Sequence, residues 1–271
     1  MSAPTHLPAA PRTTDPMRRR ARIAGVLYLL TFVSIPTLGL YQPVKDEVGT
    51  FVLGDGGSTG LMWGALSEVV VGLAGIGTAV VLFPVLKRQN ETAALGIVAA
   101  RVVETSLIFV GVISLLSLTT LRDDVVGTAD ADSASLVTAG HSLVAVYDWT
   151  FLLSQSLMPV IVDLLLGYVL LRSALVPRVL PLLALVGAPL LLASDLAVFS
   201  GLYEKGALLD GLAVIPIAAF EFSLGVYLVV KGFRPSSPLM AQPRADVPVS
   251  ALVPSPRTGV SGRDGQGAGV G

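Results

Sequence analysis

Six ionisable side chains lie within long apolar stretches of this sequence: Glu68, Arg101, Glu104, Asp163, Asp195 and Glu221. A charge at the centre of a bilayer costs about 2.5–3.5 kcal/mol on insertion scales, so such residues usually face a helix-bundle interior or water and have a function. Carboxylates in this position can exchange protons or hold a cation, and an arginine can bind an anion or balance an acid. Five acids against one base leave an imbalance. Either some of the acids are protonated, or water or a bound cation compensates them.

Depth separates these residues into two groups. Counting about 1.5 Å per residue from the predicted helix ends places Glu104, Asp163 and Glu221 near the bilayer midplane. These three acids and Arg101 are the main candidates for a ligand-binding or ion-binding centre. Glu68 and Asp195 fall in the outer third, where a side chain reaches water easily, so they are secondary candidates.

Arg101 and Glu104 are three residues apart in one predicted helix, so their side chains share a face and can pair. One interpretation is an internal ion pair that closes the bundle and fixes the rotation of the helix. The other is that Arg101 binds an anionic group or balances an acid on another helix, while Glu104 accepts and releases a proton.

Glycines follow three of the acids at a spacing of four, which places each acid and its glycine on one helix face. The pairs are Glu68 with Gly72, Asp163 with Gly167, and Glu221 with Gly225. Glycine allows a neighbouring membrane helix to approach closely. The spacing therefore predicts that each of these acids points into the bundle.

The elements that position these residues are six apolar segments. The chain has 271 residues, of which 53% are hydrophobic and 14% charged, against about 25% charged in ordinary soluble domains. A helix needs about 20 mostly apolar residues to cross a bilayer. The sequence therefore predicts an all-α, polytopic membrane bundle of six transmembrane helices, at about 23–42, 60–86, 92–121, 146–171, 179–202 and 211–230.

The distribution of basic residues predicts the orientation. Most Lys and Arg residues, beginning with Arg18, Arg19, Arg20 and Arg22, fall on the side of the two termini, and acidic residues collect on the other side. By the positive-inside rule both termini are cytoplasmic, in the plasma membrane of a bacterium. The first segment is too long for a cleaved signal peptide, so we expect it to be an anchor.

The predicted membrane domain covers residues 17–233. Residues 1–16 and 234–271 are rich in Pro, Gly, Ser, Thr and Ala, and we expect them to be disordered cytoplasmic tails. Residues 41–59 and 122–145 are predicted outer loops, with a short surface helix at Ser135 to Val146. Trp63, Tyr147 and Trp149 are predicted to anchor the interface.

Enzyme and metal-site motifs are missing. The chain has no cysteine, which excludes disulfides, thiol catalysis and iron–sulfur clusters, and its only histidines are His6 and His141. It contains neither a G-x-S-x-G elbow nor a phosphate-binding loop. We predict no catalytic residue, no metal and no cofactor, and an intramembrane enzyme would need a motif of another kind. The net charge of −1 gives no reason to expect a nucleic-acid partner.

Two short motifs resemble a known family. The sequence Ala-Arg-Ile-Ala-Gly-Val-Leu-Tyr-Leu-Leu at residues 21–30, with Arg101-Val-Val-Glu104, resembles the bacterial membrane-protein family labelled domain of unknown function 4386. The similarity covers about residues 17–233. It implies a six-helix integral membrane protein without an established activity, and it transfers no catalytic residue.

Two functions fit these observations. In the first, the protein is a small transporter or channel, and Glu104, Asp163 and Glu221, balanced by Arg101, bind a proton, a cation or a small solute. In the second, it is a structural or regulatory protein of the lipid bilayer whose buried charges only hold the helices together. A water-accessible cavity that reaches the midplane acids favours the first function. Dry acids, each bonded to Arg101 or to backbone, favour the second.

Overall fold

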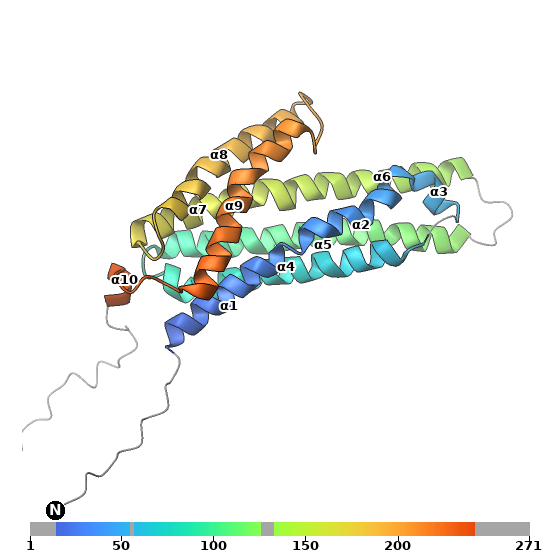
Figure 1. Cartoon of the computed structure of the whole chain (residues 1–271). Helices are drawn as coiled ribbons and strands as arrows, with labels where there is room; N and C mark the ends of the chain where they lie inside the picture. The colour runs from blue at the N-terminus through green and yellow to red at the C-terminus, as the bar shows by residue number, and fades with distance from the viewer. Residues whose placement is uncertain (1–14, 55–56, 126–132, 242–271) are drawn as a thin grey trace, which may run out of the picture.

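The computed structural model describes residues 15–54, 57–125 and 133–241, and every regular element in these ranges is a helix (Figure 1). The elements are α1 (Pro16–Thr31), α2 (Ser34–Asp46), α3 (Val48–Val52), α4 (Thr59–Leu86), α5 (Glu91–Val125), α6 (Ser133–Phe151), the π-helix η1 (Leu152–Leu157), α7 (Met158–Ser173), α8 (Val179–Phe199), α9 (Leu208–Val230) and α10 (Pro238–Ala241).

Five helical segments of the described residues are long and apolar enough to cross a membrane: Thr59–Leu86, Glu91–Asp123, Ser133–Ser173, Val179–Phe199 and Leu208–Val230. Four of them match predicted spans closely. The fifth combines α6, η1 and α7, so it begins well before the predicted start at residue 146. The short helix predicted at Ser135 to Val146 lies within α6, but its predicted place in a surface loop is wrong, because Leu136, Leu143 and Val144 pack against α3 and α5.

The first predicted span, 23–42, is divided between two helices, α1 and α2, which are separated at Phe32 and Val33. Pro36 gives the physical reason for the break. A proline lacks the backbone N–H, and its ring clashes with the carbonyl four residues earlier, which here belongs to Phe32. Short turns replace the regular pattern, with the amides of Phe32 and Val33 donating to the carbonyls of Leu29 and Leu30.

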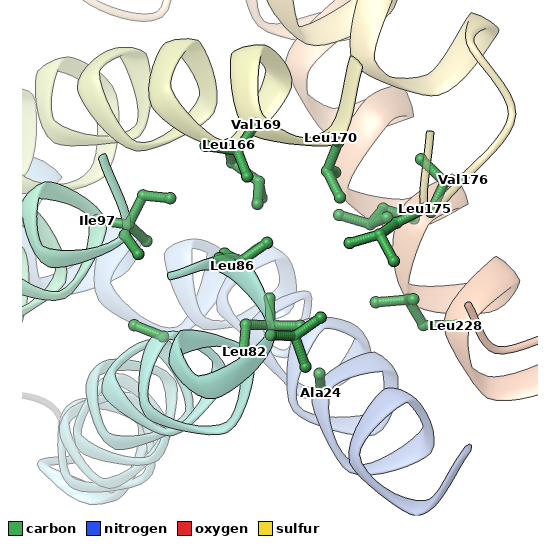
Figure 2. Packing of buried hydrophobic residues seen from close by; sticks show 14 of the residues in the cluster. Ala24, Leu82, Leu86, Ile97, Leu166, Val169, Leu170, Leu175, Val176 and Leu228 are labelled. Carbon is green, nitrogen blue, oxygen red and sulfur yellow. The ribbon is translucent and has the colours of Figure 1, made fainter. Parts of the chain in front are cut away.

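The helices pack in a sequence of neighbours. Helix α1 lies against α4 and α9, α4 against α5, α5 against α6 and α7, and α7 against α8, which pairs with α9. The α8–α9 hairpin is inclined away from α6 (Figure 1). The largest buried cluster joins α1, α4, α5, α7, α8 and α9. Figure 2 labels ten of its members: Ala24, Leu82, Leu86, Ile97, Leu166, Val169, Leu170, Leu175, Val176 and Leu228.

The two ends of the bundle differ in charge. The start of α1, the α4–α5 turn, the α7–α8 connection and α10 lie together (Figure 1). We call this the basic end, because it carries Arg18, Arg19, Arg20, Arg22, Lys87, Arg88, Arg172, Arg178, Lys231 and Arg234. The opposite, acidic end carries Asp46, Glu47, Asp123, Asp148, Glu204 and Asp210.

The packed unit continues past its predicted limit at residue 233. The amide of Arg234 donates to the Leu175 carbonyl at 2.8 Å, the Ser237 hydroxyl donates to the Ser173 carbonyl at 2.7 Å, and Leu239 joins the main cluster. These contacts hold residues 234–241, which were predicted to be part of a disordered tail. At the other terminus α1 begins at Pro16, with Asp15 as its N-cap, so the end of the predicted tail 1–16 is ordered. Residues 1–14 and 242–271 of the predicted tails lie outside the described residues.

Candidate functional site

Arg101 on α5 connects two acids in the interior of the bundle. Its Nη1 donates to both carboxylate oxygens of Glu104, at 2.8 and 2.9 Å, and its Nη2 donates to Oε1 of Glu221 on α9 at 3.1 Å. The side chains are 4%, 9% and 17% exposed for Arg101, Glu104 and Glu221. The predicted pairing of Arg101 with Glu104 is confirmed, and Glu221, 120 residues away in sequence, joins the same guanidinium.

Asp163 on α7 lies next to this pair of acids but does not bond to them. Its side chain is completely buried, and neither carboxyl oxygen has a hydrogen-bond partner within the part of the chain that the structure describes. It interacts electrostatically with Glu221, Arg101 and Glu104. We call these four residues the Arg101 cluster, and all four come from the set that the sequence singled out.

A cavity of about 180 Å³ reaches the Arg101 cluster, and we call it the central cavity. Its polar wall consists of Arg101, Glu104 and Glu221, together with Gln155 of η1. Most of the rest is apolar and comes from the break between α1 and α2 and from α4, α7, α8 and α9. A polar cavity holds a water molecule once about 10–15 Å³ is available to the probe. The central cavity therefore has room for several waters or a small solute.

Close helix contacts hold the walls of this cavity. A Cβ added to Gly25 of α1 would lie 2.6 Å from the Gly225 carbonyl oxygen, so α1 and α9 meet almost backbone to backbone one turn from Glu221. On the other side, the Thr105 hydroxyl bonds to the Gly72 carbonyl of α4 at 2.9 Å. As the acid–glycine spacing predicted, Gly72, Gly167 and Gly225 each face a neighbouring helix.

Glu68, a secondary candidate, lies outside the Arg101 cluster. It is buried, and its Oε1 accepts hydrogen bonds from the Tyr147 hydroxyl at 3.0 Å and from Nε2 of Gln155 at 3.1 Å. The prediction of Tyr147 as an interface anchor is wrong, because this ring is buried between Tyr41 and Phe151. Trp63 and Trp149 are exposed.

Asp195, the other secondary candidate, belongs to a second polar group at the acidic end. Lys205, in the connection between α8 and α9, donates to Ser156 at 2.8 Å, to Asp210 at 2.9 Å and to Asp195 at 3.4 Å. Ser156 also donates to Asp195 at 2.6 Å. These four residues, the Lys205 cluster, attach the α8–α9 connection to η1.

A wider cavity of about 560 Å³ lies beside the Lys205 cluster, and we call it the vestibule. Its charged lining residues are Lys45, Asp148, Glu204, Lys205 and Asp210, and Lys45 pairs with Asp148. Gln155 and Val214 line both the vestibule and the central cavity. The two cavities are therefore neighbours, and together they extend from the acidic end to the Arg101 cluster.

Sequence reasoning missed several polar residues that complete these sites. Lys205 carried a signal, as one of few basic residues on the acidic side, but its partners are set by the tertiary fold. Gln155 and Ser156 lie in a π-helix, which is rare and has no simple sequence pattern.

The side chains of these clusters do not form a metal cage. Among residues 15–54, 57–125 and 133–241, no three His, Asp or Glu side chains gather in a way that could hold a metal ion. The Arg101 cluster instead balances carboxylates with a guanidinium, which suits proton exchange or recognition of a charged solute.

Comparison with other proteins identifies a family. No curated protein and no solved structure matches the chain. A family model described as a domain of unknown function, DUF4386, matches residues 23–232, which includes the Arg101 cluster and the Lys205 cluster. The chain therefore belongs to the DUF4386 family.

Proposed function

We propose that this integral membrane protein is a proton-linked or cation-linked transporter or channel for a small solute, with the Arg101 cluster as its binding centre. The observation that carries the proposal is the central cavity, which reaches Glu104 and Glu221. Acids that only held the helices together would be sealed and bonded to Arg101 or to backbone. Glu221 instead remains partly accessible, and Asp163 lacks a partner among the described residues.

The charge of the cluster supports transfer of protons or cations. Three carboxylates face one guanidinium, so the fully ionised cluster has a formal charge of −2. A net negative charge in the bundle interior is unfavourable unless protons, water or a cation compensate it. Binding and release of such a species at Glu104, Asp163 and Glu221 is therefore the chemistry that this site supports best.

The proposed topology has six crossings with both termini in the cytoplasm. In it, α1 and α2 together make the first crossing, and the break at Phe32 and Val33 lies at the level of the central cavity, which Phe32 lines. The concentration of Lys and Arg at one end supports a cytoplasmic basic end in a bacterial plasma membrane.

The topology can be tested by cysteine labelling, because the natural chain has no cysteine. Glu47→Cys at the acidic end and Ser236→Cys at the basic end both replace exposed residues. A membrane-impermeant maleimide should label position 47 in intact cells, and position 236 only after lysis. The reverse pattern would show the opposite orientation.

Transport can be tested in proteoliposomes containing a trapped pH-sensitive dye, with a potassium gradient and valinomycin providing the membrane potential. We expect faster proton uptake than in empty liposomes, and its loss in Asp163→Asn. Asp123→Asn, at the exposed end of α5, is the matched control and should keep the wild-type rate. Proton uptake by the wild-type protein no faster than by empty liposomes, at every pH tested, would refute the proton-linked form of the proposal, and equal sodium uptake in the same liposomes would refute the cation-linked form.

A structural or regulatory role is the second candidate, and the Arg101–Glu104 pair favours it. Both oxygens of Glu104 are bonded to Arg101 at 2.8 and 2.9 Å, which is the geometry of a pair that fixes the rotation of a helix. In this case Asp163→Asn and Glu104→Gln should change the yield of folded protein, and no proton uptake should be measurable.

A further inference from the structure

Among the carboxylate oxygens that line the central cavity, one has no hydrogen bond from the described residues. Glu104 directs both oxygens to Nη1 of Arg101. Glu221 uses only Oε1 for Arg101, and no hydrogen bond to its Oε2 occurs within the described ranges. The Glu221 side chain is also more exposed than the side chains of Arg101 and Glu104. A ligand in the cavity would therefore meet Oε2 of Glu221 first.

The donors of Arg101 are not available in the same way. Nη1 and Nη2 are occupied by Glu104 and Glu221, and Nε is enclosed by protein without a partner in the described part of the chain. An anion in the cavity would compete with these carboxylates for the guanidinium and would be repelled by Glu221 and Asp163. A cation in the cavity would be attracted, because the formal charges of Arg101, Glu104 and Glu221 sum to −1, and the charge of the whole Arg101 cluster with Asp163 is −2.

The other walls of the cavity favour an apolar body. Phe32 lies at the break between α1 and α2, where its ring packs edge-on against Phe222 of α9 at 5.4 Å. Leu191, Ile217 and Ala218 line the cavity from α8 and α9. Mostly apolar walls with a few convergent polar groups are typical of sites for small organic molecules.

We propose that the central cavity binds a small organic monocation: an ammonium group at Oε2 of Glu221, and an apolar body against Phe32, Ile217 and Ala218. This inference rests on the proposed function and specifies the class of its solute. The vestibule supplies a route to the site from the acidic end. Its charged lining has three acids, Asp148, Glu204 and Asp210, and two lysines, so its formal charge of −1 attracts cations.

Isothermal titration of the full chain in detergent micelles tests this inference, after subtraction of titrations into empty micelles. The probes are phenethylammonium, phenethyl alcohol and 3-phenylpropionate, which share an aromatic body and differ in charge. We expect the ammonium to bind at least tenfold more tightly than the other two.

Two variants locate the binding site. Glu221→Gln removes the carboxylate and should weaken phenethylammonium binding at least tenfold, whereas Glu91→Gln, at the exposed start of α5, should leave it unchanged. Ala218→Leu fills the cavity without changing any charge, and it should also weaken binding. It keeps the test informative if Glu221→Gln does not fold.

Three results would overturn the inference. Equal binding of the alcohol and the ammonium would show that charge is not recognised, and tightest binding of the propionate would make this an anion site. Unchanged ammonium binding in Ala218→Leu would place the ligand elsewhere. The titration in micelles measures binding and the proteoliposome assay measures flux, so the two proposals can fail separately. Flux without ammonium binding contradicts only this inference, and binding without flux contradicts only transport.

Discussion

Replacing Arg101 by methionine should destabilise the protein strongly, because the substitution removes the one cation of the Arg101 cluster and leaves its three acids. In the native structure Arg101 donates two hydrogen bonds to Glu104 and one to Glu221. Removing one partner of a buried ion pair costs about 3–5 kcal/mol. Glu104, only 9% exposed, should account for most of this, and Glu221, which borders the cavity, for less.

A second substitution, alone and combined with Arg101→Met, separates the cost of losing the ion pair from the cost of losing the packing of the arginine side chain. Glu104→Gln keeps an oxygen that can accept from Nη1 and should cost about 1–3 kcal/mol by itself. In the double variant Arg101→Met/Glu104→Gln the buried charge of residue 104 is gone. Neighbouring residues in one network couple by about 0.5–3 kcal/mol. The double variant should therefore be at least about 1 kcal/mol more stable than the sum of the single effects predicts.

The measurement is unfolding by sodium dodecyl sulfate in mixed micelles, followed by circular dichroism at fixed lipid content. Arg178→Met is the matched control, because Arg178 is exposed at the basic end, and it should stay within about 0.5 kcal/mol of the wild type. If the single effects of Arg101→Met and Glu104→Gln add to within about 0.5 kcal/mol, the pair is not coupled and the reasoning is refuted.

Three further predictions concern the helices around the cavity. Gly25→Ala should destabilise the protein by about 1–3 kcal/mol in the same unfolding assay, because the added methyl group would push α1 away from α9. Gly39→Ala is the control, since Gly39 has open space around it, and should not destabilise the protein. Equal effects of the two substitutions would contradict the close contact. Lys205→Met should accelerate amide hydrogen exchange in residues 201–207, because it releases the α8–α9 connection from η1. Lys231→Met is the control and should not change this exchange. Unchanged exchange in Lys205→Met would show that the Lys205 cluster does not hold the connection. Pro36→Ala should stabilise a continuous helix through residues 32–33 and slow amide exchange there, and unchanged exchange would mean that packing, not proline, sets the break.

Features within one helix can be predicted from the sequence, whereas contacts between distant helices cannot. The Arg101–Glu104 pair was predictable because a spacing of three within one helix fixes the geometry. The apolar length of the segments predicted where most of the membrane-spanning helices lie. In contrast, the attachment of Glu221 to Arg101 depends on how closely α9 approaches α1 at Gly25 and Gly225, which no single segment encodes.

Two boundaries were missed for physical reasons. The polar residues near Ser133 resemble a loop, but Leu136 and Leu143 find apolar partners on α3 and α5, and tertiary packing outweighs local polarity. Residues 234–241 resemble the start of a tail, yet the burial of Leu239 and two hydrogen bonds to residues 173 and 175 hold them.

The π-helix η1 also lets neighbouring residues of one long helix bond in two directions. Its neighbouring residues Gln155 and Ser156 bond to different partners, Glu68 on α4 and Asp195 on α8. A π-turn holds one residue more than an α-turn, and each residue turns an α-helix by about 100°. Deleting Gln155 or Ser156 would restore a regular α-helix, because the wide turn absorbs one extra residue, and would remove a hydrogen bond from Glu68 or Asp195. The extra residue therefore lets one continuous helix serve two polar sites.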